Sequence, residues 1–163
     1  MPPAGGSLLQ APDPGGGTRP ALYSVEALPG SSLATWDETE YAWQFALSAA
    51  WRLRRLDPET LEPAAELRLG FAPSGLAVAP DGWRAYAFDA RSDDLAEIDL
   101  ATGQTRVLDR VPGHRPWGLT ATADRVYVAA PRSAEVWAVD RQRGRRVQVV
   151  RVGPAPVALG PAP

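Results

Sequence analysis

The sequence contains no cysteine, no lysine and no asparagine, and it has one histidine, His114. Without cysteine the chain can form neither a disulfide framework nor a thiolate metal site, and a catalytic thiol is excluded. A single histidine cannot provide a catalytic histidine pair or a multi-histidine metal site. The two other missing residue types have A-rich codons, so their absence favours a GC-rich, bacterial-like coding composition. A thermal adaptation that removes asparagine is the alternative.

Long hydrophobic runs and strong charge of either sign are absent too. No apolar run approaches the roughly 18 residues that a helical membrane span needs, so no membrane span is expected. The formal net charge is −2, with 22% charged and 45% hydrophobic residues, which is ordinary for a globular chain. A charge this small does not predict nucleic-acid binding.

Residues 1–20 form a leader rich in proline and glycine. It lacks the basic start and the long apolar stretch of a secretory signal. One interpretation is a disordered leader. The other is a hairpin, because PDPGGG is strong turn chemistry between apolar runs at Ser7–Gln10 and Ala21–Leu28. Such a hairpin would supply the outer strands of a repeat unit.

A period of about 40 residues becomes readable from Leu28 onward. Three kinds of marker share it: leucines that follow a proline, aspartates that close a short apolar run, and aromatic residues between them. They are Leu33, Leu76, Leu119 and Leu159; Asp57, Asp99 and Asp140; and Trp43, Tyr86 and Tyr127. Alternating apolar residues and Gly/Pro/Asp punctuation predict four short strands in each repeat, which is typical of a β-propeller blade.

The predicted fold class is therefore all-β, a propeller-type array of four-stranded antiparallel blades. We expect three to four blades, either incomplete or completed by oligomerisation, because closed propellers usually have four or more. Residues 21–163 would hold the repeats. The expected boundaries are 31–70, 74–112 and 117–152, followed by a final inner strand at 156–160.

The chain resembles the YVTN-type β-propeller repeat family, named for a tetrapeptide in its second strand. That element is matched by Tyr127–Ala130, and the family's Pro-x-Gly-hydrophobic start by Pro73–Leu76 and Pro116–Leu119. Its DG turn is matched by Asp81–Gly82, and its Asp-to-Gly turn by Asp99–Gly103. The resemblance covers about three repeats, and weaker copies of the tetrapeptide stand at 86–89 and 43–46.

Two departures from the family pattern are present. Ala129 and Ala130 stand where Thr-Asn or Ala-Asn is expected, and Glu38–Thr39 replaces Asp-Gly in the first repeat. Members of the family serve as surface proteins, scaffolds, cofactor-dependent enzymes and lactonases. The resemblance implies a periplasmic or cell-surface location but does not select one of these functions.

The candidate ligand- or partner-binding residues lie in loops, where propellers carry function. Loops that lead into strands hold Trp83, His114, Arg115 and Trp117. The hairpin RQRGRR holds Arg143, Arg145 and Arg146, which could bind phosphate or an acidic partner surface. The alternative for both groups is exposure to solvent on loops and at the outer rim.

Asp89, Asp93 and Asp94 crowd one turn and are weak candidates for a calcium site. Their spacing does not match a calcium-loop motif, so a solvated turn is the alternative. No P-loop, dinucleotide fingerprint or G-x-S-x-G motif occurs, so the sequence names no catalytic residue and predicts no cofactor.

The sequence therefore favours a binding or scaffold module over an enzyme. A partner or ligand would be recognised by the loops that lead into the inner strands. A protein partner or a second copy would pair with the open blade edges. Two alternatives stay open: a lactonase- or cofactor-type propeller enzyme, and an inactive fragment of a larger propeller.

Overall fold

The computed structural model describes residues 8–11, 21–28, 34–37, 42–45, 51–89, 91–110 and 118–153. All regular elements in these ranges are β-strands, and they contain no helix long and apolar enough to cross a membrane. The all-β class predicted from the sequence is confirmed.

Twelve of the strands form three antiparallel sheets of four strands each, which we call blades 1, 2 and 3. Blade 1 has the order β1 (Leu8–Ala11), β2 (Ala21–Ala27), β5 (Trp51–Leu56) and β6 (Pro63–Leu69). Blade 2 comprises β7 (Pro73–Val78), β8 (Arg84–Asp89), β9 (Asp94–Asp99) and β10 (Thr105–Arg110). Blade 3 comprises β11 (Gly118–Ala121), β12 (Arg125–Ala130), β13 (Glu135–Asp140) and β14 (Arg145–Arg151).

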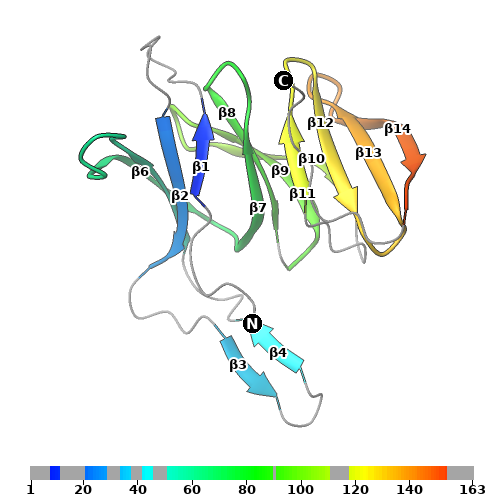
Figure 1. Ribbon diagram of the computed structural model, residues 1–163, viewed down its shortest axis with the longest axis horizontal. Coiled ribbons are helices and arrows are strands. Elements are labelled where there is room, and N and C mark those ends of the chain that lie inside the picture. The colour runs from blue at the N-terminus through cyan, green and yellow to red at the C-terminus, as the bar shows by residue number, and fades with distance from the viewer. Residues whose placement is uncertain are drawn as a thin grey trace.

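The three blades stand side by side with blade 2 in the middle (Figure 1). Their first strands are neighbours, since β7 contacts both β1 and β11. The last strands, β6, β10 and β14, are the outer edges of the blades. Inner strands gathered together and outer strands on the rim are the arrangement of a propeller.

Blade 1 differs from the arrangement expected for the first repeat. The N-terminal hairpin β1–β2 forms its inner half, with Val25 opposite Leu53, instead of the outer strands of a closing blade. A second hairpin, β3 (Ala34–Asp37) and β4 (Ala42–Phe45), follows β2 and pairs with no strand of the three blades. It stands apart from them in Figure 1.

This inserted hairpin explains the difference. It contains Trp43, which the sequence spacing had aligned with Tyr86. In the blades the equivalent of Tyr86 is Tyr23. Tyr86 pairs with Glu97, which lies two residues before Asp99. Tyr23 likewise pairs with Arg55, which lies two residues before Asp57. The aspartate spacing survives because the insertion precedes β5. The final strand expected at 156–160 lies outside the described residues.

Blade 2 is buried on both faces, because alternate side chains of a strand point to opposite sides of the sheet. One face packs on blade 1 and the other on blade 3. The first core contains Tyr23, Val25, Leu53, Ala85, Ala87 and Ile98. The second contains Tyr86, Phe88, Leu95, Val128, Trp137 and Val139. The near-continuous apolar character of β8 and β9 follows from this double burial.

The recurring aspartates close the turn between the third and fourth strands. The Asp99 carboxylate accepts hydrogen bonds from the backbone N–H groups of Ala101 and Thr102, both at 2.9 Å. Asp57 and Asp140 do the same in blades 1 and 3. Aspartate recurs here because its short carboxylate can bond to backbone N–H groups two and three residues ahead.

The fourth residue after each aspartate has a positive φ. It is Gly103 (74°) in blade 2 and Gly144 (59°) in blade 3, but Leu61 (59°) in blade 1. Glycine adopts this conformation without steric cost, whereas a side chain is strained there.

Leu61→Gly should therefore stabilise the fold by about 0.5–1 kcal/mol. Leu61 is 60% exposed, so little apolar burial is lost. The measurement is the free energy of unfolding by denaturant titration. The matched change in the opposite direction is Gly103→Ala, whose added Cβ would lie 3.3 Å from the Leu67 side chain. An unchanged or lower stability for Leu61→Gly would contradict the shared turn geometry.

Candidate functional site

Arg141 joins blade 3 to blade 2. It follows β13, and its side chain, 11% exposed, reaches into the adjacent blade. Its Nη2 donates to Asp81 Oδ2 at 3.0 Å and its Nε donates to the Tyr86 hydroxyl. Its Nη1 donates to the carbonyl oxygens of Thr122 and Ala123 in its own blade. This Arg141 clamp satisfies a guanidinium that would be costly to bury alone.

The clamp continues into a buried acid. Tyr86 donates its hydroxyl hydrogen to Glu97, which is 9% exposed, with 3.2 Å between the oxygens. Arg106 Nε donates to the same carboxylate at 2.8 Å, and Arg106 Nη2 donates to the Arg141 carbonyl at 3.0 Å. Burial raises the pKa of Tyr86 to about 12, and the Glu97 charge adds to the rise while Arg141 opposes it. Tyr86 therefore stays a donor to Glu97.

Asp81 is the acidic end of the clamp. Partial burial by itself would raise the pKa of its carboxyl. Hydrogen bonds from the backbone N–H of Trp83 and from Arg141 outweigh that effect and hold the pKa below its ordinary value. The charged pair thus favours the packed arrangement of blades 2 and 3 at neutral pH.

The interface between blades 1 and 2 has the same geometry but different residues. Leu100 N donates to Trp83 O at 3.0 Å, as Arg141 N donates to Asp124 O at 3.0 Å one blade later. Leu100 therefore occupies the position of Arg141. By strand register, Arg55 takes the place of Glu97, and Ala65 that of Arg106.

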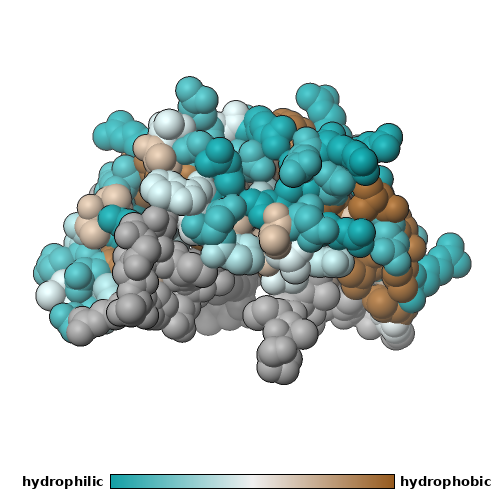
Figure 2. Space-filling model, turned by 90° about the horizontal axis from the view of Figure 1, so that it is seen from above, coloured by the Kyte–Doolittle hydropathy of each residue, from teal (hydrophilic) through white to brown (hydrophobic). Residues whose placement is uncertain are grey.

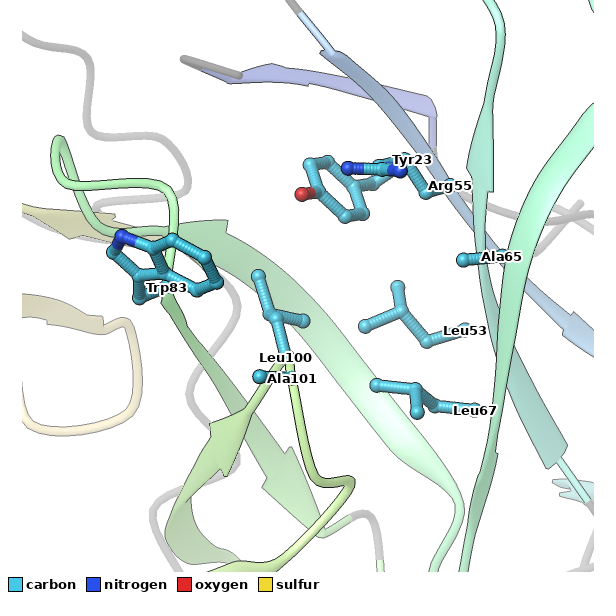
Figure 3. A pocket seen from close by; sticks show the side chains of 8 residues that line it. All are labelled: Tyr23, Leu53, Arg55, Ala65, Leu67, Trp83, Leu100 and Ala101. Carbon is cyan, nitrogen blue, oxygen red and sulfur yellow. The ribbon is translucent and has the colours of Figure 1, made fainter. Parts of the chain in front are cut away.

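These replacements leave a pocket of about 250 Å³ between blades 1 and 2. A leucine and an alanine stand where the next interface has two arginines, so the space is not filled. Figure 3 shows Trp83 and Leu100 on one wall, facing Tyr23, Arg55 and Leu53 on the other. The described residues that line it are Tyr23, Leu53, Arg55, Ala65, Leu67, Trp83, Leu100 and Ala101.

Most of this lining is aliphatic or aromatic. Tyr23 and Arg55 are its polar members and lie next to each other in Figure 3. Trp83 is 47% exposed and leaves its indole at the mouth of the pocket. Apolar walls with a few convergent polar groups are typical of small-molecule sites, and this volume is below the usual range for drug-sized ligands.

Of the residues proposed from the sequence that the structure describes, Trp83 lines this pocket. Arg143 and Arg145 are exposed in the β13–β14 hairpin, and Arg143 lies 3.6 Å from Asp140. Arg146 instead points inward: its Nε donates to Asp109 of blade 2 at 3.2 Å, and its guanidinium lies 4.1 Å from the centre of the Trp137 ring. Arg146 therefore helps to join the blades.

The other proposed residues give no site in the described structure. His114, Arg115 and Trp117 lie outside the described residues. Asp89 closes the β8–β9 turn by accepting the N–H of Arg91 at 2.9 Å, and Asp93 has a positive φ of 59° in that turn. Within the described ranges, no three His, Cys, Asp or Glu side chains come together as a metal site, Asp94 included.

The sequence pattern predicts no binding role for Tyr23, Arg55 and Leu100, which line the pocket. A usable signal was present at the residue after each recurring aspartate, which is Leu100 in one repeat and Arg141 in the next. The inserted hairpin hid the equivalence of Tyr23 and Tyr86, so the partners of these residues could not be aligned.

These geometries define a class, a propeller-type array of antiparallel blades. No protein-family model and no curated protein matches the sequence. Solved structures with the same fold include a gluconolactonase from Xanthomonas campestris, with 16% identity and a TM-score of 0.61 over 87% of this chain and 47% of that one. A calcium-binding regucalcin from Agrobacterium tumefaciens matches with 15% identity and a TM-score of 0.59, over 93% of this chain and 47% of that one.

A luciferin-regenerating enzyme gives a similar match: 19% identity and a TM-score of 0.59 over 94% of this chain and 49% of that one. At these identities the likeness establishes the fold alone. The chain spans about half the length of the three structures. Its three blades therefore correspond to about half of each of them.

Arg141→Met should lower the free energy of unfolding by about 2–4 kcal/mol, because it leaves Asp81 without its cation and the Tyr86 hydroxyl without its donor. The contribution of the Asp81–Arg141 pair to stability is fully present above 3.8, the pKa of aspartate in the unfolded chain. It is lost as the pH falls through the lower pKa that Asp81 has in the folded protein. The penalty, measured by denaturant titration, should therefore shrink below about pH 3.8. Arg143→Met, in the same hairpin but exposed, is the control and should cost less than about 0.5 kcal/mol.

Proposed function

We propose that the chain is a ligand-binding propeller module that takes a small amphipathic molecule between blades 1 and 2. The observation that supports this is the replacement of the Arg141 clamp by an apolar pocket at the equivalent position. Two interfaces with the same backbone geometry differ in whether their space is filled. The filled one is a structural joint, and the open one is available to a ligand.

The lining indicates the class of ligand. An apolar body, flat or short-chained, would pack between Trp83 and Leu53, where aromatic and aliphatic surfaces face each other. A carboxylate or carbonyl oxygen would lie toward Tyr23 and Arg55, which offer a phenol and a guanidinium. An arylacetic acid has this combination of groups.

Leu100→Arg should close the pocket, since it installs the side chain that fills the equivalent position in the next interface. We expect binding of phenylacetate, followed by ligand-observed NMR, to weaken at least about tenfold. Val107→Arg adds the same charge at an exposed position of β10 and should leave binding unchanged. Trp83→Ala, at the pocket mouth, should also weaken it.

Phenylacetate that binds equally to Leu100→Arg and to the unaltered protein would contradict the proposal. So would an unaltered protein that shows no binding at millimolar ligand. The melting temperature of each variant verifies that a loss of binding is not a loss of folding.

A second candidate is a lactonase-type enzyme. It is supported by the fold shared with the Xanthomonas gluconolactonase over 87% of this chain. Two acids of blade 2 already have partners: Asp81 accepts from Arg141 Nη2, and Asp89 accepts from the backbone N–H of Arg91. An active site would therefore need other residues, in the remaining loops or in further blades.

The enzyme candidate predicts saturable hydrolysis of δ-gluconolactone, measured as acid release at constant pH with and without calcium. A rate above the buffer rate that disappears with a chelator would favour it. The same rate as buffer, from a sample that still binds phenylacetate, would favour the binding module.

A further inference from the structure

Strand β14 is an outer edge with an unusual surface. In the described part of the chain it pairs with β13 alone, so alternate backbone N–H and C=O groups point away from the sheet. Val147, Val149 and Val150 are 41%, 47% and 45% exposed. Figure 2 shows apolar side chains gathered at this end of the array.

The other two outer edges differ from it. Strand β6 begins with Pro63, which has no N–H to donate, and its exposed residues include no β-branched side chain. Strand β10 has one exposed valine, Val107, and its Arg106 and Asp109 are held by Glu97 and Arg146. Exposed β-branched residues on an unpaired edge favour strand addition, and β14 has the most of them.

The charge of this edge is of one sign. Residues 141–153 contain five arginines and no acid, although the chain as a whole is slightly acidic. Arg141 and Arg146 are engaged with blade 2. Arg145 and Arg151 stand at the two ends of β14 and are exposed. An added strand would therefore meet apolar side chains between two cations.

A second copy of β14 fits this edge poorly. In an antiparallel pairing centred on Gln148, Arg145 of each copy would lie opposite Arg151 of the other copy. In a parallel, in-register pairing, each arginine would lie beside the same arginine of the other copy. Like charges directly opposite each other destabilise a sheet. Val147 is a bulge, because its neighbours Arg146 and Gln148 pair with the consecutive residues Val139 and Ala138 of β13. This bulge further disfavours a long continuous ladder between two copies.

We propose that β14 is a docking edge for an extended acidic segment of a protein partner, which adds to blade 3 as a fifth strand. The segment would pair along Gln148–Arg151, where the register with β13 is regular. Because successive residues of a strand point to opposite faces, its carboxylates would lie near Arg151 on the face of Val149, and its apolar residues against Val150 on the other face. This surface is distinct from the pocket between blades 1 and 2.

The test uses a capped heptapeptide of alternating glutamate and valine, labelled for fluorescence anisotropy and titrated with the full chain. We expect saturable binding that weakens at least about tenfold in the double variant Arg145→Glu with Arg151→Glu. Arg151→Glu alone should weaken it less. Arg68→Glu is the matched control, because Arg68 is exposed on the outer edge of blade 1, and it should leave binding unchanged.

Two further peptides separate strand pairing from charge alone. A peptide with lysine in place of glutamate should not bind, and one with N-methylated valines should bind at least about tenfold more weakly, since its backbone cannot complete the ladder. Equal binding of the N-methylated peptide would overturn strand addition. Equal binding of the lysine peptide, or no effect of the double variant, would overturn the choice of an acidic partner.

Discussion

The packing of one blade face on the next is the constraint on which this structure depends. Blade 2 has no solvent-facing side over most of β8 and β9, so its alternating residues must match two different neighbours. Toward blade 3 the match is completed by the Arg141 clamp, which places a cation among Asp81, Tyr86 and backbone carbonyls. Charges are tolerated there because nearly every donor has an acceptor.

The pocket is a consequence of the same constraint. The two interfaces share a backbone hydrogen bond but differ in side-chain volume, so equivalent positions are filled in one interface and open in the other. Leu100 and Ala65 take the places of Arg141 and Arg106, and neither can span the gap. In repeat proteins, comparing equivalent interfaces inside one chain can therefore locate a cavity and indicate its chemistry.

The arginines of the last hairpin divide by position. Arg141 and Arg146 point inward and connect blades 2 and 3, whereas Arg143, Arg145 and Arg151 remain exposed. They lie within eleven residues of each other, and the sequence pattern alone predicts that Arg143, Arg145 and Arg146 form one cluster at the rim. Strand alternation and the neighbouring blade, which the local pattern does not show, decide which arginines are structural.

The all-β class, the blade unit and the aspartate turns were determined by the sequence, because they rest on local chemistry: alternation, turn residues and short-range hydrogen bonds. Tertiary structure alone decided the rest. A hairpin insertion moved the register of blade 1, so Tyr23 and not Trp43 took the place of Tyr86. The pocket, the clamp and the exposed edge depend on contacts between residues far apart in the chain. No local sequence pattern specifies which face of one blade packs on which face of the next.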